Sequence, residues 1–133
     1  MKRWQIWLLA VVVLAALPAV FAQSSSTAVP KYDKASEAVF KGTIVEVRDR
    51  QCPVSGGVGS HLVMKLSDGS TVEVHLSSSK FVKQYELVFK PGDGLEITGV
   101  KVRFQDADAI FARKIKHGTD EFLFRDNDGK PLW

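Results

Sequence analysis

Apolar and polar positions alternate along most of the chain from residue 39 onward. A period of two is typical of strands with one buried face. The segments expected as strands are 39–49, 61–66, 70–76, 95–104, 109–116 and 121–125. Residues that favour turns separate these segments, as in Pro91-Gly92-Asp93-Gly94. The pattern therefore predicts a mainly β domain.

The turn Ser67-Asp68-Gly69 fixes the register of the second and third expected strands. A two-residue turn would set the apolar residues of one strand opposite the polar residues of the other. A three-residue loop with Gly69 left-handed places both apolar sets on one face. It pairs Leu62 with Val74 and Met64 with Val72. It also places His61 opposite His75 on the other face, which is expected to meet solvent.

One short helix is expected between the third and fourth strands. Apolar residues recur at helical spacing between Ser77 and Phe89, and a serine precedes them as a cap. The helix must end before Pro91, which restricts the residue ahead of it. Within the next strand, Gly99 predicts a bulge or a bend.

The chain begins with the features of a secretory signal peptide. Lys2 and Arg3 precede an apolar run over residues 6–20, and Ala22 ends a stretch suited to a signal peptidase. We expect residues 1–22 to be removed, residues 23–37 to be a flexible segment and residues 38–133 to form the domain. The mature protein would then lie in the periplasm or outside the cell, with no stable membrane span.

Charge and aromatic content argue against a nucleic-acid partner. The chain has 18 basic and 15 acidic residues, and removal of Lys2 and Arg3 leaves a balance of +1. The polar face of the second and third strands has no Phe, Tyr or Trp on which bases could stack. Binding of single-stranded nucleic acid is therefore an alternative that the composition disfavours.

Three segments carry a resemblance to a known architecture. They are Gly42-Thr43-Ile44-Val45, the hairpin Asp68–Val74, and Pro91–Gly99 after the helix. With the signal peptide, the chain resembles exported bacterial OB-fold proteins over residues 39–116. The resemblance implies a small barrel of five to six strands with one helix between strands three and four. It also implies a non-catalytic module that binds a small ligand or a protein, with no catalytic residues and no cofactor. The loop around Cys52 and residues 122–133 depart from the minimal pattern.

The candidate site is the polar face of the second and third strands. The residues expected to contact a ligand there are His61, His75, Lys65, Glu73 and Cys52. An alternative is a metal site in which His61 and His75 hold Zn²⁺ or Cu²⁺, with Glu73 or Cys52 as a further ligand.

Two expectations concern the assembly and the core. Cys52 is the single cysteine, so we expect a monomer, with a Cys52-linked dimer as the alternative. Phe122, Phe124 and Trp133 are expected in the core, because aromatic residues dominate small cores.

Overall fold

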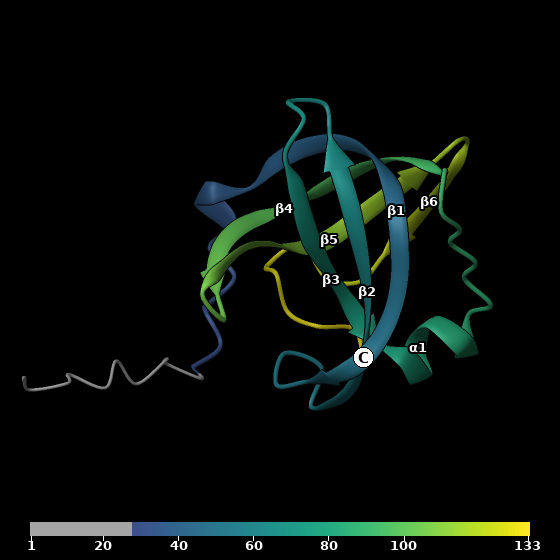
Figure 1. Ribbon diagram of the computed structural model, residues 1–133. Coiled ribbons are helices and arrows are strands. Elements are labelled where there is room, and N and C mark those ends of the chain that lie inside the picture. The colour runs from purple at the N-terminus through teal and green to yellow at the C-terminus, as the bar shows by residue number, and fades with distance from the viewer. Residues whose placement is uncertain (1–27) are drawn as a thin grey trace, which may run out of the picture.

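The computed structural model describes residues 28–133, and Figure 1 shows their arrangement. The expected signal peptide, 1–22, lies outside the described residues. The elements are a 3-10 turn η1 (Lys34–Ser36), β1 (Ala38–Cys52), β2 (Gly57–Leu66), β3 (Thr71–Ser78), α1 (Ser79–Gln84), β4 (Gly94–Phe104), β5 (Ala107–His117) and β6 (Asp120–Leu123). The prediction of a mainly β chain with one short helix between strands three and four is confirmed. No helix in the described part of the chain is both long enough and apolar enough to cross a membrane.

The helix is shorter than the expected range of 77–89. The hydroxyl of Ser78 caps it by accepting a hydrogen bond from the backbone N–H of Phe81. Glu86 then takes a positive φ of 53°, which ends the helical run two residues beyond Gln84. The remaining residues up to Pro91 form the connection to β4.

The six strands form one sheet in the order β3-β2-β1-β4-β5-β6, with antiparallel neighbours throughout. In addition, β3 pairs with β5 in parallel, through Glu73–Ala109, Val74–Ile110 and His75–Phe111. The pairings from β1 through β2, β3, β5 and β4 therefore return to β1. Figure 1 shows the result, with the β2–β3 hairpin crossing in front of β4 and β5.

The predicted register of the β2–β3 hairpin is confirmed. Leu62 lies opposite Val74, and His61 lies opposite His75. The N–H of Leu66 donates to the carbonyl of Ser70, which closes the three-residue loop. Gly69 has the expected positive φ, at 86°.

A β-bulge at Val45 changes which face the end of β1 presents. Ile44 lies opposite Met64, but Glu46 lies opposite Val63, so Val45 is the extra residue. A strand that gains one residue turns its following side chains to the other face of the sheet. As a result, Ile44 faces the main core, whereas Cys52 faces the opposite side.

The predicted irregularity at Gly99 is confirmed as a bulge between β4 and β5. Thr98 pairs with Lys114 and Gly99 pairs with Ala112, so Arg113 is the extra residue. A Cβ atom at Gly99 would overlap the carbonyl oxygen of Phe111. Glycine at this position therefore allows the two strands to approach closely.

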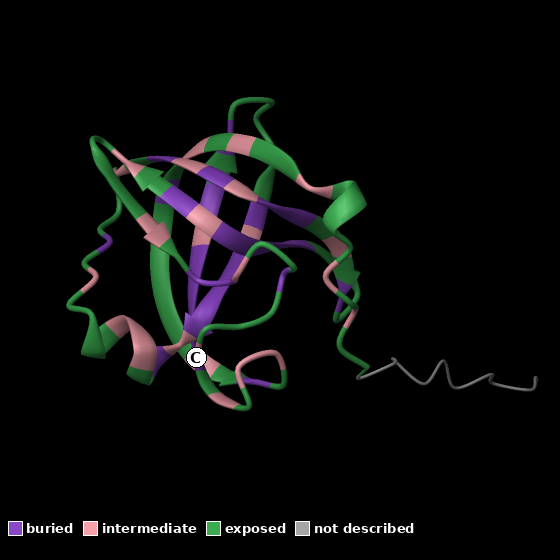
Figure 2. Cartoon of the chain, turned by 180° about the vertical axis from the view of Figure 1, so that it is seen from behind, coloured by how far each residue is buried: buried purple, intermediate pink, exposed green. Residues whose placement is uncertain are grey.

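The buried residues form two clusters on opposite faces of the sheet, because Ala109 and Phe111 of one alternate along β5 with Ile110 and Ala112 of the other. Figure 2 shows where the buried residues lie along the strands. The main cluster includes Leu62, Met64, Val74, Ile97, Ile110 and Phe124. The expected core position is confirmed for Phe124, whereas Phe122 and Trp133 are only partly buried against this cluster. The second cluster consists of Cys52, Val100, Phe104, Ala109 and Phe111.

A partly buried ion pair fastens the N-terminal segment to β5, and we call it the Glu37 clasp. The guanidinium of Arg113 donates to both carboxylate oxygens of Glu37 at 2.8 Å, and the hydroxyl of Tyr32 donates to Oε2 at 2.6 Å. Arg125 lies over the Tyr32 ring, 5.2 Å from its centroid. Within the expected flexible segment 23–37, residues 32–37 are thus held by specific contacts. The side chain of Arg113 is itself buried.

Substitution of Glu37 by glutamine should destabilise the fold. The change leaves the buried Arg113 without its carboxylate partner, so we expect the free energy of unfolding to fall by about 3 kcal/mol at neutral pH. Urea denaturation measures this. Glu121→Gln is the matched control, because Glu121 pairs with Lys114 at the surface, and its loss should change stability by less than about 1 kcal/mol. If both substitutions lower the free energy of unfolding equally, the clasp contributes no more than a surface ion pair.

The same clasp should give the protein a specific acid dependence. The hydrogen bonds from Arg113 lower the pKa of Glu37 to about 2. A lowered pKa in the folded state stabilises the fold above the ordinary value, and this contribution declines as the pH falls from about 4.5 towards 2. The stability difference between wild type and Glu37→Gln should therefore shrink over that interval. A difference that stays constant down to pH 2 would contradict this assignment.

Candidate metal centre

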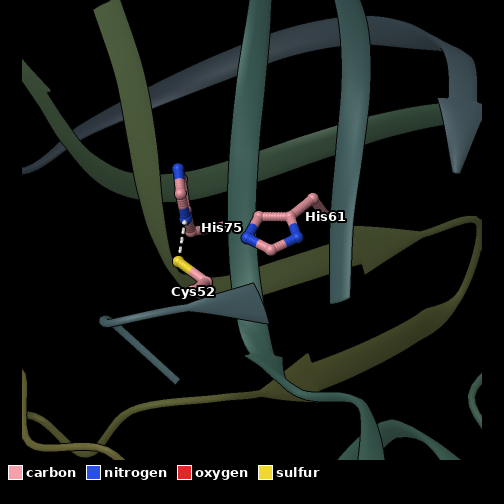
Figure 3. A group of neighbouring side chains, drawn as sticks. All are labelled: Cys52, His61 and His75. Carbon is pink, nitrogen blue, oxygen red and sulfur yellow. Dashed lines mark hydrogen bonds between the residues drawn. The ribbon is translucent and has the colours of Figure 1, made fainter. Parts of the chain in front are cut away.

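Three side chains with metal-ligating atoms meet at the second cluster. Cys52 comes from the end of β1, His61 from β2 and His75 from β3, and Figure 3 shows them turned towards one another. One ligand atom from each lies within 4.8 Å of those of the other two. Sγ of Cys52 is 3.5 Å from Nδ1 of His75. The two imidazole rings meet edge to face, with centroids 4.6 Å apart.

Strand pairing explains why these residues meet. His61 and His75 are directly opposite in the β2–β3 hairpin, and Arg48 of β1 is opposite His61 on the other side. Alternation then places Arg50 and Cys52 on the same face as Arg48. The bulge at Val45 is required, because without it Cys52 would face the main core.

The expectation that the two imidazoles meet solvent is wrong. His61 is 0% exposed and His75 is 4% exposed. The second cluster covers them, and the ring of His75 lies 5.5 Å from the Phe104 ring and 5.3 Å from the Phe111 ring. The open ligand surface expected on this face is therefore absent at the histidines, and the site is an internal one.

The two histidines differ in how their nitrogens are satisfied. Nδ1 of His75 contacts the Cys52 thiol, and its Nε2 lies 3.3 Å from Oε1 of Glu73. In His61, both nitrogens are buried and neither makes a hydrogen bond of regular geometry among residues 28–133, although backbone groups of Arg48 and Gly59 lie close enough to raise the pKa of the ring. An unpartnered buried polar group destabilises a fold by about 1–3 kcal/mol. His61 is thus the residue of the cluster whose buried nitrogens a bound ligand would satisfy.

The electrostatics keep both imidazoles neutral. Burial, together with the neighbouring His61, lowers the pKa of His75 to about 4. Burial also lowers the pKa of His61, because the charged ring would lose its hydration. Neutral imidazole is the form that binds metals.

Glu73 and two arginines form an outer layer around His75. Burial raises the pKa of Glu73, but hydrogen bonding by Arg50 and the nearby positive charges outweigh it and lower the pKa overall. Arg50 pairs closely with Glu73, and Arg48 approaches it at 3.7 Å. The ionised carboxylate favours a proton on Nε2 of His75, which leaves the Nδ1 lone pair facing Cys52.

Of the residues around the cluster, one expected member lies elsewhere and one unexpected residue lies close by. Lys65 is exposed, near the far end of the hairpin, and does not join the cluster. Arg50 was missed in the sequence, although the spacing Arg48-x-Arg50-x-Cys52 places all three on one face of a strand. Beside the cluster is a pocket of about 280 Å³, whose wall includes Arg48, Arg50, Glu73 and His75.

The spacing of the donor atoms fits a transition-metal ion. In a tetrahedral centre with a Zn–S bond of about 2.3 Å and a Zn–N bond of about 2.1 Å, sulfur and nitrogen are about 3.6 Å apart. The observed Cys52–His75 separation is 3.5 Å. His61 lies somewhat farther, within the 4.8 Å limit of the group, so a side-chain adjustment would complete a three-ligand site. Among the described residues, this is the one group of three such side chains in which every member is buried.

The fold and the site define a small, mainly β protein with an internal cysteine–histidine cluster. The model of the MamS/MamX magnetosome protein family matches residues 36–122. The chain therefore belongs to the MamS/MamX magnetosome protein family, a bacterial family. Comparison with curated proteins gave no match. The family match covers β1 to β5 in full and all three residues of the cluster.

The position of the turn 53–56, which follows Cys52, should depend on glycine at position 59. A Cβ atom there would stand 3.0 Å from Cε1 of His61 and would overlap the Ser55 side chain. Gly59→Ala should therefore displace the turn 53–56, lower the free energy of unfolding by about 1–3 kcal/mol and speed the reaction of Cys52 with a thiol reagent. Gly57→Ala is the control, because nothing lies within 4 Å of its added Cβ. If both variants behave alike, the close approach of Ser55 to Gly59 does not hold the turn in place.

Proposed function

We propose that the protein is a non-catalytic module that binds one transition-metal ion of the zinc or copper class through Cys52, His61 and His75. The observation that carries the proposal is the pair of buried nitrogens of His61, which make no hydrogen bond of regular geometry and lie beside a thiol and a second imidazole. Sulfur and imidazole nitrogen are the donors that such ions prefer. All three residues lie on strands, and a metal bound between them would coordinate one of the two buried nitrogens of His61.

We further propose that the sheet is a barrel of the OB-fold type. Support comes from the succession of pairings that returns to β1, with the helix between β3 and β4 and the parallel β3–β5 pairing. In such a barrel, the ion would lie outside the main core, at the edge of the second cluster to which Cys52 belongs.

Export and setting are also proposals. The sequence features of residues 1–22 support removal of a signal peptide and delivery to the periplasm or beyond. Since the family is described by its association with the magnetosome, we propose that the module serves that structure. The expected ligand surface on the β2–β3 face is not proposed, because the histidines that would form it are buried.

Metal binding can be tested on the purified full chain. After incubation with Zn²⁺ or with Cu⁺ under oxygen-free conditions and removal of free ion, elemental analysis should find one metal per chain. Bound metal should also raise the unfolding temperature, because a ligand that binds only the folded state stabilises it. His61→Ala should lose the bound ion.

His117→Ala is the matched control. His117 is the third histidine, is partly exposed and lies 3.6 Å from Asp93, away from the cluster. This variant should bind metal like wild type. Absence of both ions from the wild-type chain, or equal binding by His61→Ala, would refute the proposed function.

A further inference from the structure

The charge balance inside the second cluster distinguishes between metal ions. A thiol that binds a metal releases its proton. Replacement of that proton by Cu⁺ leaves the net charge of the site unchanged, whereas replacement by Zn²⁺ adds one positive charge. The imidazoles contribute no charge in their neutral form.

The surroundings of the cluster disfavour an added positive charge. Its apolar wall is formed by Val100, Phe104, Ala109 and Phe111. A charge taken out of water into such surroundings is strongly destabilised unless an opposite charge accompanies it.

The ionised groups near the cluster also disfavour an added positive charge. Glu73 is the carboxylate at the cluster, and it is already paired with Arg50 and approached by Arg48. A third guanidinium, that of Arg125, lies 5.7 Å from the centroid of the Phe111 ring. Arg48 is also paired with Glu46 at 2.7 Å. Three guanidinium groups and two carboxylates, those of Glu73 and Glu46, therefore lie around the site, which leaves one positive charge in excess.

The ligand number points the same way. Cys52, His61 and His75 supply three donors, and Glu73 meets His75 at Nε2, the nitrogen turned away from Cys52. Structural zinc centres take four ligands, and catalytic ones complete the fourth position with water or substrate. Copper(I) is satisfied by few ligands and favours soft thiolate donors.

From these observations we infer that the physiological ligand of the Cys52–His61–His75 site is a monovalent soft ion, copper(I), rather than zinc(II). This inference rests on the proposed function and deepens it by naming the ion class. In the binding step, a Cu–S bond forms, the S–H bond of Cys52 breaks and one proton leaves to solvent. Both imidazoles bind through nitrogen lone pairs, and no electron is transferred.

A competition experiment tests the inference. The full chain is mixed under oxygen-free conditions with Cu⁺ supplied as its bathocuproine disulfonate complex, in the presence of a tenfold molar excess of Zn²⁺. We expect the protein to withdraw one equivalent of Cu⁺ from the chelator and to retain no zinc. X-ray absorption at the copper edge should then show one sulfur and two nitrogen neighbours.

Two variants separate electrostatic from ligand effects. Cys52→Ser should weaken Cu⁺ binding at least about 100-fold, since the soft donor is lost, while His117→Ala should match wild type. Arg50→Gln removes a positive charge without touching a ligand. It should raise the Zn²⁺ affinity about tenfold and leave the Cu⁺ affinity within about twofold.

The outcomes are distinguishable from those of the proposed function. Retention of zinc in place of copper by the wild-type chain would overturn the inference and leave the proposed function standing. Equal changes in both affinities on Arg50→Gln would also overturn it, because the charge balance would then not select the ion. Failure of both ions to bind would refute the two proposals together. The wild-type competition needs no variant, so a misfolded variant does not block the test.

Discussion

The β-bulge at Val45 is the constraint on which the internal site depends. It adds one residue to β1 between the pairs Ile44–Met64 and Glu46–Val63. Before the bulge, β1 contributes Ile44 to the main core. After it, the same alternation turns Arg48, Arg50 and Cys52 towards His61 and His75. One inserted residue thus assembles donors from three strands on a single face.

The second face can hold such a cluster because long-range packing covers it. Phe104 and Phe111 come from β4 and β5 and pack edge to face against His75. The parallel pairing of β3 with β5 brings His75 directly opposite Phe111. The site therefore depends on the pairing of β3 with β5 as well as on the β2–β3 hairpin. Rigid strands support both histidines, which is the arrangement that preorganises a binding site.

Local signals in the sequence were sufficient for part of this structure. The loop Ser67-Asp68-Gly69 determined the hairpin register, because only one loop length places both apolar sets on one face. The irregularity at Gly99 also followed from residue type. The burial of His61 could not be predicted in this way, since the polar residues on the same face of the hairpin, Lys65, Thr71 and Glu73, indicate solvent.

The information that was missing is long-range. The phenylalanines that cover His75 lie about thirty residues farther along the chain, and their contacts depend on the β3–β5 pairing. The bulge at Val45 had no signal either, because the bulged residue is valine in a run with regular alternation. Without it, the sequence gives no reason for Cys52 to face the histidines.

A purely structural role for the histidines explains His75 but not His61. His75 has the Cys52 thiol on one nitrogen and the Glu73 carboxylate near the other, so it would be a satisfied core residue. His61 has no side-chain hydrogen-bond partner of this kind within the described chain, and an apolar side chain of similar size would fill the same space without a poorly satisfied polar atom. A buried polar group of this kind requires an explanation, and a bound ion is one of the recognised explanations. Since its nearest ligating neighbours are a thiol and an imidazole, a soft metal ion is the partner whose chemistry fits.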